Sequence, residues 1–169
     1  MSKSKIVIII NGRGGVGKDA LCDLAAKHYE VMNVSSITPV KTIAEICGWD
    51  GTKDAKSRKF LSDLKRVLTD FNDFPTNYLF SCYQAFLKGN SDIMFAHIRE
   101  GSEIEKFRNL VVGCPCLTLL VRRNQGEEWG NSSDDEVENF SYDLEFSNNG
   151  TLEEAERKFV LLLESVLKR

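Results

Sequence analysis

The sequence predicts an α/β fold in which a parallel five-stranded sheet is flanked by helices on both faces. Two apolar runs without alternation, KIVIII at 5–10 and CLTLLV at 116–121, are typical of strands buried on both faces of a parallel sheet. Segments with apolar residues at helical spacing separate the predicted strands. No repeat, low-complexity stretch or linker interrupts residues 1–169, so we expect one domain with one core.

The first half of the chain alternates strands and helices. The strand at 5–10 leads into a glycine-rich loop and a helix that starts near Gly17, and a second short strand is predicted at 31–37. Pro39 suits the first turn of a helix that ends at Gly48. An apolar stripe at 3.6-residue spacing then predicts a long amphipathic helix: Phe60, Leu61, Leu64, Val67, Leu68 and Phe71.

The second half continues this alternation. The predicted elements are a helix at 76–88 ended by Gly89, a strand at 92–98, a helix at 102–111, strands at 116–121 and 142–146, and a last helix. Thr151 and Glu154 form a capping box at the start of that last helix. Residues 124–138 are polar and acidic, and they predict a short, mobile, lid-like loop.

Composition excludes several classes of protein. A formal net charge of −3 argues against general nucleic-acid binding, which favours a basic excess. No apolar run approaches the roughly 20 residues that span a bilayer, and the apolar run after MSKSK is too short for a signal-peptide core. The five cysteines are scattered, and the spacing Cys114-Pro115-Cys116 suits neither zinc nor a redox motif. We therefore expect a cytoplasmic protein that binds neither nucleic acid nor membrane.

The stretch GRGGVGKDA, residues 12–20, follows the first predicted strand directly. Its spacing Gly-x-x-x-x-Gly-Lys is that of the Walker A phosphate-binding loop, in which glycines let successive N–H groups point at one anion beside a helix N-terminus. Lys18 is expected to reach the β- and γ-phosphates of ATP. The alternative is a glycine-rich turn with no ligand. The predicted nucleotide-binding residues are Gly12, Arg13, Gly14, Gly15, Val16, Gly17, Lys18, Asp19 and Ala20.

Asp19 stands where such loops carry Ser or Thr, whose hydroxyl group binds Mg²⁺. A carboxylate is also a hard oxygen ligand that suits Mg²⁺. Because it adds negative charge beside a triphosphate, the site should depend strongly on the metal. The alternative role of Asp19 is to stabilise the first turn of the helix.

With this loop the chain resembles the P-loop nucleoside and deoxynucleoside monophosphate kinases, in the Gly-Lys-Asp variant of phage-type enzymes; animal phosphomevalonate kinases share the loop type. Further landmarks follow in the family's order: Ile37-Thr38-Pro39-Val40-Lys41, Arg58-Lys59-Phe60-Leu61, His97-Ile98-Arg99 with Glu103, Val121-Arg122-Arg123, and Tyr142-Asp143 followed by Asn148 or Asn149 and Gly150-Thr151-Leu152. The resemblance implies a three-layer kinase fold. His97 replaces the family's Asp and Ala20 its Thr, which should weaken catalysis more than nucleotide binding.

Phosphoryl transfer needs positioning and charge neutralisation, so catalytic roles are assigned here by charge. Lys18 should act on the donor. Arg99, at a strand end, should bind the acceptor phosphate or the transferred group, and Arg122 and Arg123 should close over that group or stack on a base. Solvent-exposed arginines remain the alternative. The predicted acceptor-binding residues are Lys41, Arg58, Lys65 and Arg99. On the long amphipathic helix, Arg58 and Lys65 fall together on one flank of the apolar stripe.

Three functions follow from these observations. The first is a kinase that transfers the γ-phosphate of ATP, with Mg²⁺, to a phosphorylated small molecule, with a nucleoside or deoxynucleoside monophosphate as the favoured acceptor. The second is a phosphomevalonate-type kinase. The third is an ATP-binding regulatory protein with little or no turnover, although acceptor-side arginines argue against it. A homodimer remains open as a partner.

Overall fold

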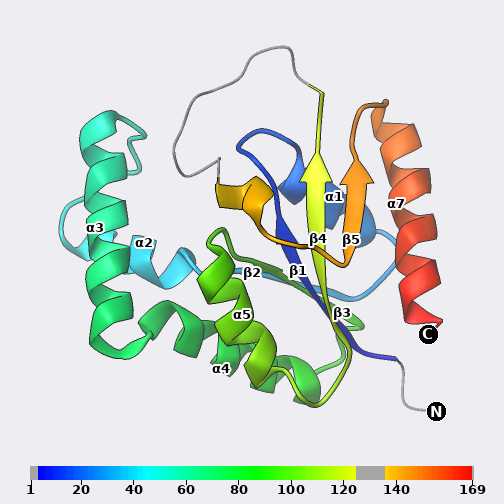
Figure 1. Ribbon diagram of the computed structural model, residues 1–169, viewed down its shortest axis with the longest axis horizontal. Coiled ribbons are helices and arrows are strands. Elements are labelled where there is room, and N and C mark those ends of the chain that lie inside the picture. The colour runs from blue at the N-terminus through cyan, green and yellow to red at the C-terminus, as the bar shows by residue number, and fades with distance from the viewer. Residues whose placement is uncertain (1–3, 125–135, 169) are drawn as a thin grey trace.

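The computed structural model describes residues 4–124 and 136–168. Its centre is a five-stranded sheet in the order β2-β3-β1-β4-β5, with every pair parallel. The strands are β1 (Ile6–Asn11), β2 (Val31–Ser35), β3 (Ile93–His97), β4 (Cys116–Arg122) and β5 (Leu144–Ser147). The predicted parallel α/β sheet flanked by helices is therefore confirmed (Figure 1).

Helices connect the strands within the described residues. They are α1 (Lys18–Ala25), α2 (Thr38–Ile46), α3 (Ala55–Asn72), α4 (Phe74–Lys88), α5 (Gly101–Leu110) and α7 (Leu152–Leu167), with a short 3₁₀ turn, η1 (Glu136–Asn139). Pro39 lies in the first turn of α2, and the capping box of Thr151 and Glu154 opens α7, as predicted. Both helix starts follow from local sequence signals.

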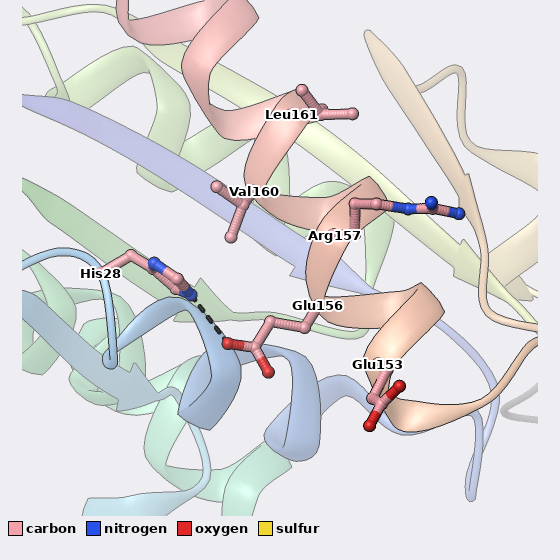
Figure 2. A pocket seen from close by; sticks show the side chains of 6 residues that line it. All are labelled: His28, Glu153, Glu156, Arg157, Val160 and Leu161. Carbon is pink, nitrogen blue, oxygen red and sulfur yellow. Dashed lines mark hydrogen bonds and ion pairs between the residues drawn. The ribbon is translucent and has the colours of Figure 1, made fainter.

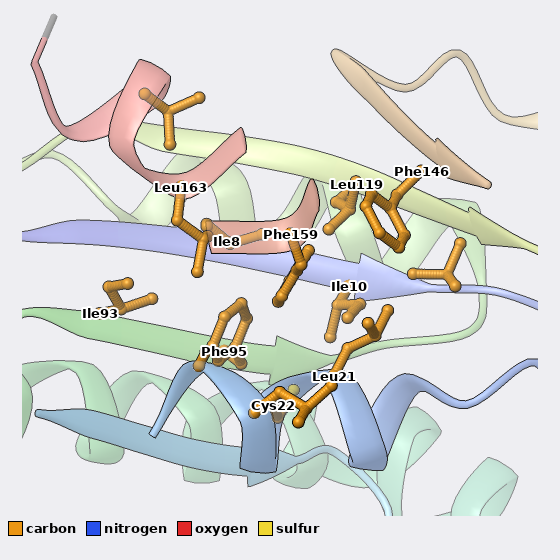
Figure 3. Packing of buried hydrophobic residues seen from close by; sticks show 14 of the residues in the cluster. Ile8, Ile10, Leu21, Cys22, Ile93, Phe95, Leu119, Phe146, Phe159 and Leu163 are labelled. Carbon is orange, nitrogen blue, oxygen red and sulfur yellow. The ribbon is translucent and has the colours of Figure 1, made fainter. Parts of the chain in front are cut away.

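The even-numbered residues of β1 build the core beneath α1 and α7. Ile8 and Ile10 are fully buried with Leu21 of α1 and Phe159 of α7. The ring of Phe159 lies 6.1 Å from that of Phe95 and 5.2 Å from that of Phe146, measured between centroids. Figure 3 shows these side chains meeting between the sheet and the two helices.

The odd-numbered residues of β1 face the opposite layer. Val7 and Ile9 are buried against Phe86 of α4 and Phe107 of α5. Because side chains of a strand alternate between faces, a strand covered by helices on both sides must be apolar at every position. This is the physical reason why the unbroken KIVIII run marks the central strand.

Helix α3 departs from a usual amphipathic helix, because none of its residues is buried. The predicted stripe forms a helix, but Val67 and Phe71 remain 54% and 82% exposed. α3 contacts α2 and α4 rather than the sheet, and it stands at the edge of the molecule (Figure 1). Periodicity predicted the helix correctly, but it does not determine what covers the apolar face.

Lys5 forms a long-range contact that the sequence did not indicate. Its Nζ donates to the carbonyl oxygens of Phe86, Gly89 and Ser91 at 3.0, 2.9 and 2.6 Å. These carbonyls lie at the end of α4, where the helix dipole favours a cation. The charge at the start of β1 thus ties the central strand to α4.

The predicted lid-like loop at 124–138 lies mostly outside the described residues, which resume at η1. Val137 of η1 is fully buried, so this end of the segment is anchored to the core. Among the described residues, no helix is long and apolar enough to cross a membrane.

Asp143 ties β4 to the turn that precedes β5. Its carboxylate accepts hydrogen bonds from the backbone N–H and the hydroxyl of Thr118, at 2.8 and 3.1 Å. It also forms an ion pair with Arg108 at 3.1 Å. Burial raises the pKa of Asp143, but these hydrogen bonds outweigh it and hold the pKa below the usual 3.8. Between the lowered pKa and 3.8 the unfolded chain binds more protons, so the free energy of unfolding rises with pH there.

We expect Asp143→Asn to lower the free energy of unfolding at neutral pH by about 1–2 kcal/mol, the value of charge-assisted hydrogen bonds. The loss should shrink as the pH falls from 3.8 through the lowered pKa of the native carboxylate, where this group becomes protonated in the folded protein. Urea unfolding at several pH values measures both. Asp70→Asn, on exposed α3, is the control. A loss that is constant across this pH range would contradict the role given to the Asp143 charge.

Candidate active site

The carboxyl ends of β1, β2 and β3 open into a cleft of about 1190 Å³. Open parallel sheets bind ligands at this edge, because the loops that follow the strands meet there. The glycine-rich loop after β1 forms one wall, and α2, the connection to α3, and α3 itself form the opposite wall. The two walls bring together residues that are far apart in the sequence.

The backbone of the loop has the conformation that its glycines allow. Gly15 and Gly17 have φ values of 79° and 91°, in the left-handed region that L side chains rarely adopt. Gly17 is the N-cap of α1, and no side chain caps the helix there. The N-terminal N–H groups of α1 therefore lie beside the cleft, where an anion would satisfy them.

Two further residues hold the loop in place. A Cβ at Gly12 would lie 2.6 Å from the carbonyl oxygen of Val121, so only glycine lets the loop pass this close to β4. Asn148, after β5, donates from Nδ2 to the carbonyl oxygen of Val16 at 2.9 Å. Asn149 instead accepts from the backbone N–H of Asn124 at 2.7 Å. Of the two asparagines in the final landmark, Asn148 is the one that contacts the loop.

Lys18 lies over the loop it belongs to. Its Nζ donates to the carbonyl oxygens of Gly12 at 2.7 Å and Arg13 at 3.1 Å, and the side chain lines the cleft. The charge is thus held where phosphate oxygens would reach it. A phosphate is a stronger acceptor than a carbonyl group, so Lys18 can exchange these bonds for a bound nucleotide.

Asp19 and His97 lie together at the base of the cleft. Asp19 Oδ1 is 3.9 Å from His97 Nε2, which also lies 2.7 Å from the amide oxygen of Asn33. Burial lowers the pKa of His97, while the Asp19 carboxylate opposes that shift. His97 is therefore a neutral donor to Asn33 at neutral pH. An uncharged ring thus lies beside the Asp19 carboxylate.

The donor set around Asp19 decides how a Mg²⁺ ion could bind. The described residues contain no cluster of three or more His, Cys, Asp or Glu side chains arranged to hold a metal. The Asp19 side chain is 90% exposed and lines the cleft. Mg²⁺ commonly uses one or two carboxylates and completes its shell with water and substrate phosphates. Asp19 fits that pattern as a single protein ligand.

Asn11, the last residue of β1, joins three segments at the cleft, and sequence reasoning missed it. Its Nδ2 donates to the carbonyl oxygen of Arg99 and to the hydroxyl of Tyr142, both at 2.9 Å. Its Oδ1 accepts from the backbone N–H of Gly12 at 2.9 Å. Only 2% of the residue is exposed. A polar residue ending an otherwise apolar strand was the available signal.

The predicted acceptor residues all reach the cleft. Lys41 of α2, Arg58 and Lys65 of α3, and Arg99 after β3 line it. Lys53 and Lys59 line it as well, and the sequence did not single them out. Lys65 pairs with Glu100 at the cleft edge and is 14% exposed. Tertiary structure therefore gathers cations from four segments opposite the loop.

The other two predicted arginines lie elsewhere. Arg122 pairs with Glu138 of η1 at 2.6 Å and with Glu145 at 3.5 Å, and Arg123 is exposed at the end of β4. Neither residue lines the cleft. Glu138 also approaches Arg13 Nε at 3.6 Å, so one carboxylate bridges the loop and β4. The contact of these arginines with a transferred phosphate stays a prediction.

Glu103, the last residue of the His97 landmark, is a structural link. It is 8% exposed on α5, and it accepts from the hydroxyl of Thr76 at 2.8 Å and from Lys106 at 3.0 Å. Thr76 belongs to α4, so this buried carboxylate joins two helices of the same layer. It does not line the cleft.

A second depression of about 340 Å³ lies along α7 beside the turn after α1 (Figure 2). His28 Nε2 and Glu156 Oε1 are 2.8 Å apart there, and Lys27 also pairs with Glu156 at 3.1 Å. Exposed Leu161 and half-buried Val160 supply the apolar part. None of its lining residues belongs to the glycine-rich loop, so the larger cleft is the candidate site.

No family model matches this sequence, and no curated protein sequence does. Solved structures do resemble the fold. A tunicamycin resistance protein from Deinococcus radiodurans has a TM-score of 0.57 and 10% identity, covering 94% of this chain and 95% of that chain. A thymidylate kinase from Ehrlichia chaffeensis has a TM-score of 0.53 and 12% identity, covering 95% and 99%. A gluconokinase from Sinorhizobium meliloti has a TM-score of 0.51 and 12% identity, covering 98% and 94%.

At these identities the likeness establishes the fold and leaves the substrate open. The fold is one that kinases of chemically different small molecules share, as the names thymidylate kinase and gluconokinase show. Function has to be argued from the cleft itself.

Proposed function

We propose that the chain is an ATP-dependent kinase that transfers the γ-phosphate to a phosphorylated small molecule. The observation that carries this proposal is the arrangement of charge in the cleft. Lys18 and the loop form the donor side, and Lys41, Arg58, Lys65 and Arg99 line the same cavity. A protein that only binds ATP has no use for a second cationic wall. Residues 1–169 would then form one kinase domain, with 124–138 as its lid.

The donor phosphates would lie in the loop at 12–20. The N–H groups at the start of α1 and the Lys18 ammonium would bind their oxygens, and Asp19 would hold Mg²⁺. When bound, Mg²⁺ neutralises charge on the phosphates. His97 adds no negative charge beside Asp19, since burial keeps it neutral at neutral pH. This limits repulsion between the protein and the triphosphate.

The acceptor would bind between the loop and the α2–α3 wall. An oxygen of its phosphate would form a bond to the γ-phosphorus while the bond to the β–γ bridging oxygen breaks, and ADP would leave with that electron pair. Arg99 follows β3, and its carbonyl oxygen is bonded to Asn11 at the root of the loop. It is therefore positioned to bind an acceptor phosphate near the donor.

Arg122 and Arg123 would act at a later stage. Arg122 would have to exchange Glu138 for a phosphate, which is a stronger partner for its guanidinium group. Arg13 shares Glu138, so nucleotide binding at the loop and release of Arg122 would be linked through one carboxylate.

The test is ADP formation from Mg²⁺-ATP with a panel of acceptors: every ribo- and deoxyribonucleoside monophosphate, phosphomevalonate, and water alone. We expect at least one phosphorylated acceptor to raise the rate well above the water control, and EDTA to abolish that rate because Asp19 would hold the Mg²⁺ that neutralises the donor phosphates. The proposal fails if ATP binds but every acceptor gives the water rate. The chain would then be an ATP-binding regulatory protein.

A further inference from the structure

Three cations on the α2–α3 wall have side chains without a protein partner. Lys41 of α2, Lys53 of the connection and Arg58 of α3 line the cleft, and no hydrogen bond or ion pair joins these side chains to another residue in 4–124 or 136–168. Their neighbours differ, because Lys59 pairs with Asp63 and Lys65 with Glu100. The unpartnered charges are thus concentrated away from the loop.

The charge of the cleft is opposite to that of the chain. Among the described residues, seven lysine or arginine side chains line it against the two carboxylates of Asp19 and Glu100. The chain as a whole has a formal net charge of −3. A low-dielectric cleft with one sign of charge attracts ligands of the opposite sign. Lys18 and the loop serve the donor phosphates, so Lys41, Lys53 and Arg58 are left over beyond the single acceptor phosphate at Arg99.

The described lining contains no Phe, Tyr or Trp. Its apolar atoms come from aliphatic side chains such as Val34, Ile37 and Leu61. Trp49 lies within the α2–α3 connection but not in the cleft lining, and its indole N–H donates to the carbonyl oxygen of Thr52 at 2.9 Å. A nucleobase gains most of its affinity from stacking on aromatic rings. The α2–α3 wall lacks that surface.

Small polar groups also line the cleft. Ser35 ends β2, Ser36 follows it, Thr38 begins α2, and Ser62 of α3 lines the same cleft. Hydroxyl groups both donate and accept, which suits an acceptor that carries hydroxyl groups of its own. The lining therefore resembles a site for a polar aliphatic molecule.

We propose that the acceptor is an aliphatic phosphate with a second anionic group, either a carboxylate or another phosphate, and no nucleobase. Its reacting phosphate would lie at Arg99, and its second anion at Lys41, Lys53 and Arg58. This inference rests on the proposed kinase function and specifies its substrate class. The transfer forms the bond to the γ-phosphorus described above and releases ADP, and the second anion takes no part in bond making.

The first experiment measures binding by calorimetry without ATP. The probes are 3-phosphoglycerate and fructose 1,6-bisphosphate, which carry a second anion, glycerol 3-phosphate, which does not, and AMP and dTMP. We expect the two-anion compounds to bind at least about tenfold more tightly than the other three, since each additional ionic contact contributes on this order. Comparing 3-phosphoglycerate with fructose 1,6-bisphosphate shows whether a carboxylate or a phosphate is the preferred second anion. Tighter binding of AMP or dTMP would overturn the inference.

Variants test whether the cations of the α2–α3 wall cause the tighter binding of the two-anion compounds. Arg58→Ala and Lys53→Ala should each weaken binding of the two-anion compounds by about tenfold and leave glycerol 3-phosphate within about twofold. Lys56→Ala removes a charge from the first turn of α3 outside the cleft lining and should change neither. An equal loss for every probe, or a loss in Lys56→Ala as large as in Arg58→Ala, would contradict the second-anion site.

ADP formation with the same probes separates the two proposals. If the two-anion compounds bind through Arg58 but no acceptor tested raises ADP formation, the kinase function fails and the anion site stands. If a nucleoside monophosphate is phosphorylated without any dependence on Arg58 or Lys53, the kinase function stands and this inference fails.

Discussion

Lys18→Ala is expected to lower the rate of ADP formation by about 10²- to 10³-fold, the usual effect of removing one group that stabilises charge developing in the transition state. The Lys18 ammonium lies on the carbonyl oxygens of Gly12 and Arg13, at the mouth of the loop. Among the described residues, the other cations that line the cleft lie beyond the loop, on the opposite wall and after β3, so they do not take its place.

The same variant should unfold at nearly the same urea concentration, since Lys18 is half-buried at the cleft rather than part of the hydrophobic core. Lys27→Ala is the matched control. Lys27 lies just after the same helix and pairs with Glu156, outside the cleft. A Lys18→Ala protein that retains most of its activity would show that the loop is a turn without catalytic function.

Asn11→Ala is expected to lower the free energy of unfolding by about 3 kcal/mol, because it leaves the buried Gly12 N–H and the Arg99 carbonyl oxygen without their partner. It should also weaken ATP binding. Asn11 fixes the residue at which the loop begins, and it holds the Arg99 backbone and Tyr142 around that point. Urea unfolding and calorimetric titration with ATP measure the two effects.

Thr76→Val is the control that separates the loss of stability from the loss of ATP binding. It also removes a buried side-chain hydrogen bond, from Thr76 to Glu103, but it does so between α4 and α5, far from the loop. We expect Thr76→Val to lose stability and to keep its affinity for ATP. If Asn11→Ala loses stability alone, as the control does, then the loop geometry does not depend on Asn11.

Local signals predicted the elements of this fold well. The unbroken apolar runs became the central strands, Pro39 and the Thr151–Glu154 capping box started helices where expected, and Gly48 follows the end of α2 in the left-handed conformation. Each of these signals acts within a few residues, so the chain needs no distant partner to express it. The loop at 12–20 was likewise predicted from a local signal, the spacing of its glycines and Lys18.

Side-chain partners were predicted less well, because they depend on segments far apart in the sequence. The ion pairs of Arg122 with Glu138 and Glu145 had no signal in the sequence, because only the path of the chain after β4 brings these residues near. The apolar stripe of α3 was recognised, yet its exposure follows from the position of α3 beyond the edge of the sheet. Periodicity carries no information about position relative to other elements.

The sequence by itself determined the parallel α/β fold and a glycine-rich loop that leads into Lys18 and Asp19 at the start of α1. Tertiary structure alone decided what faces that loop. It placed Lys41, Lys53 and Arg58 on one wall, put His97 beside Asp19, and made Asn11 the junction of three segments. The physical reason is that backbone conformation follows from neighbouring residues, whereas the charge and shape of a cleft arise from contacts between segments that only folding brings together.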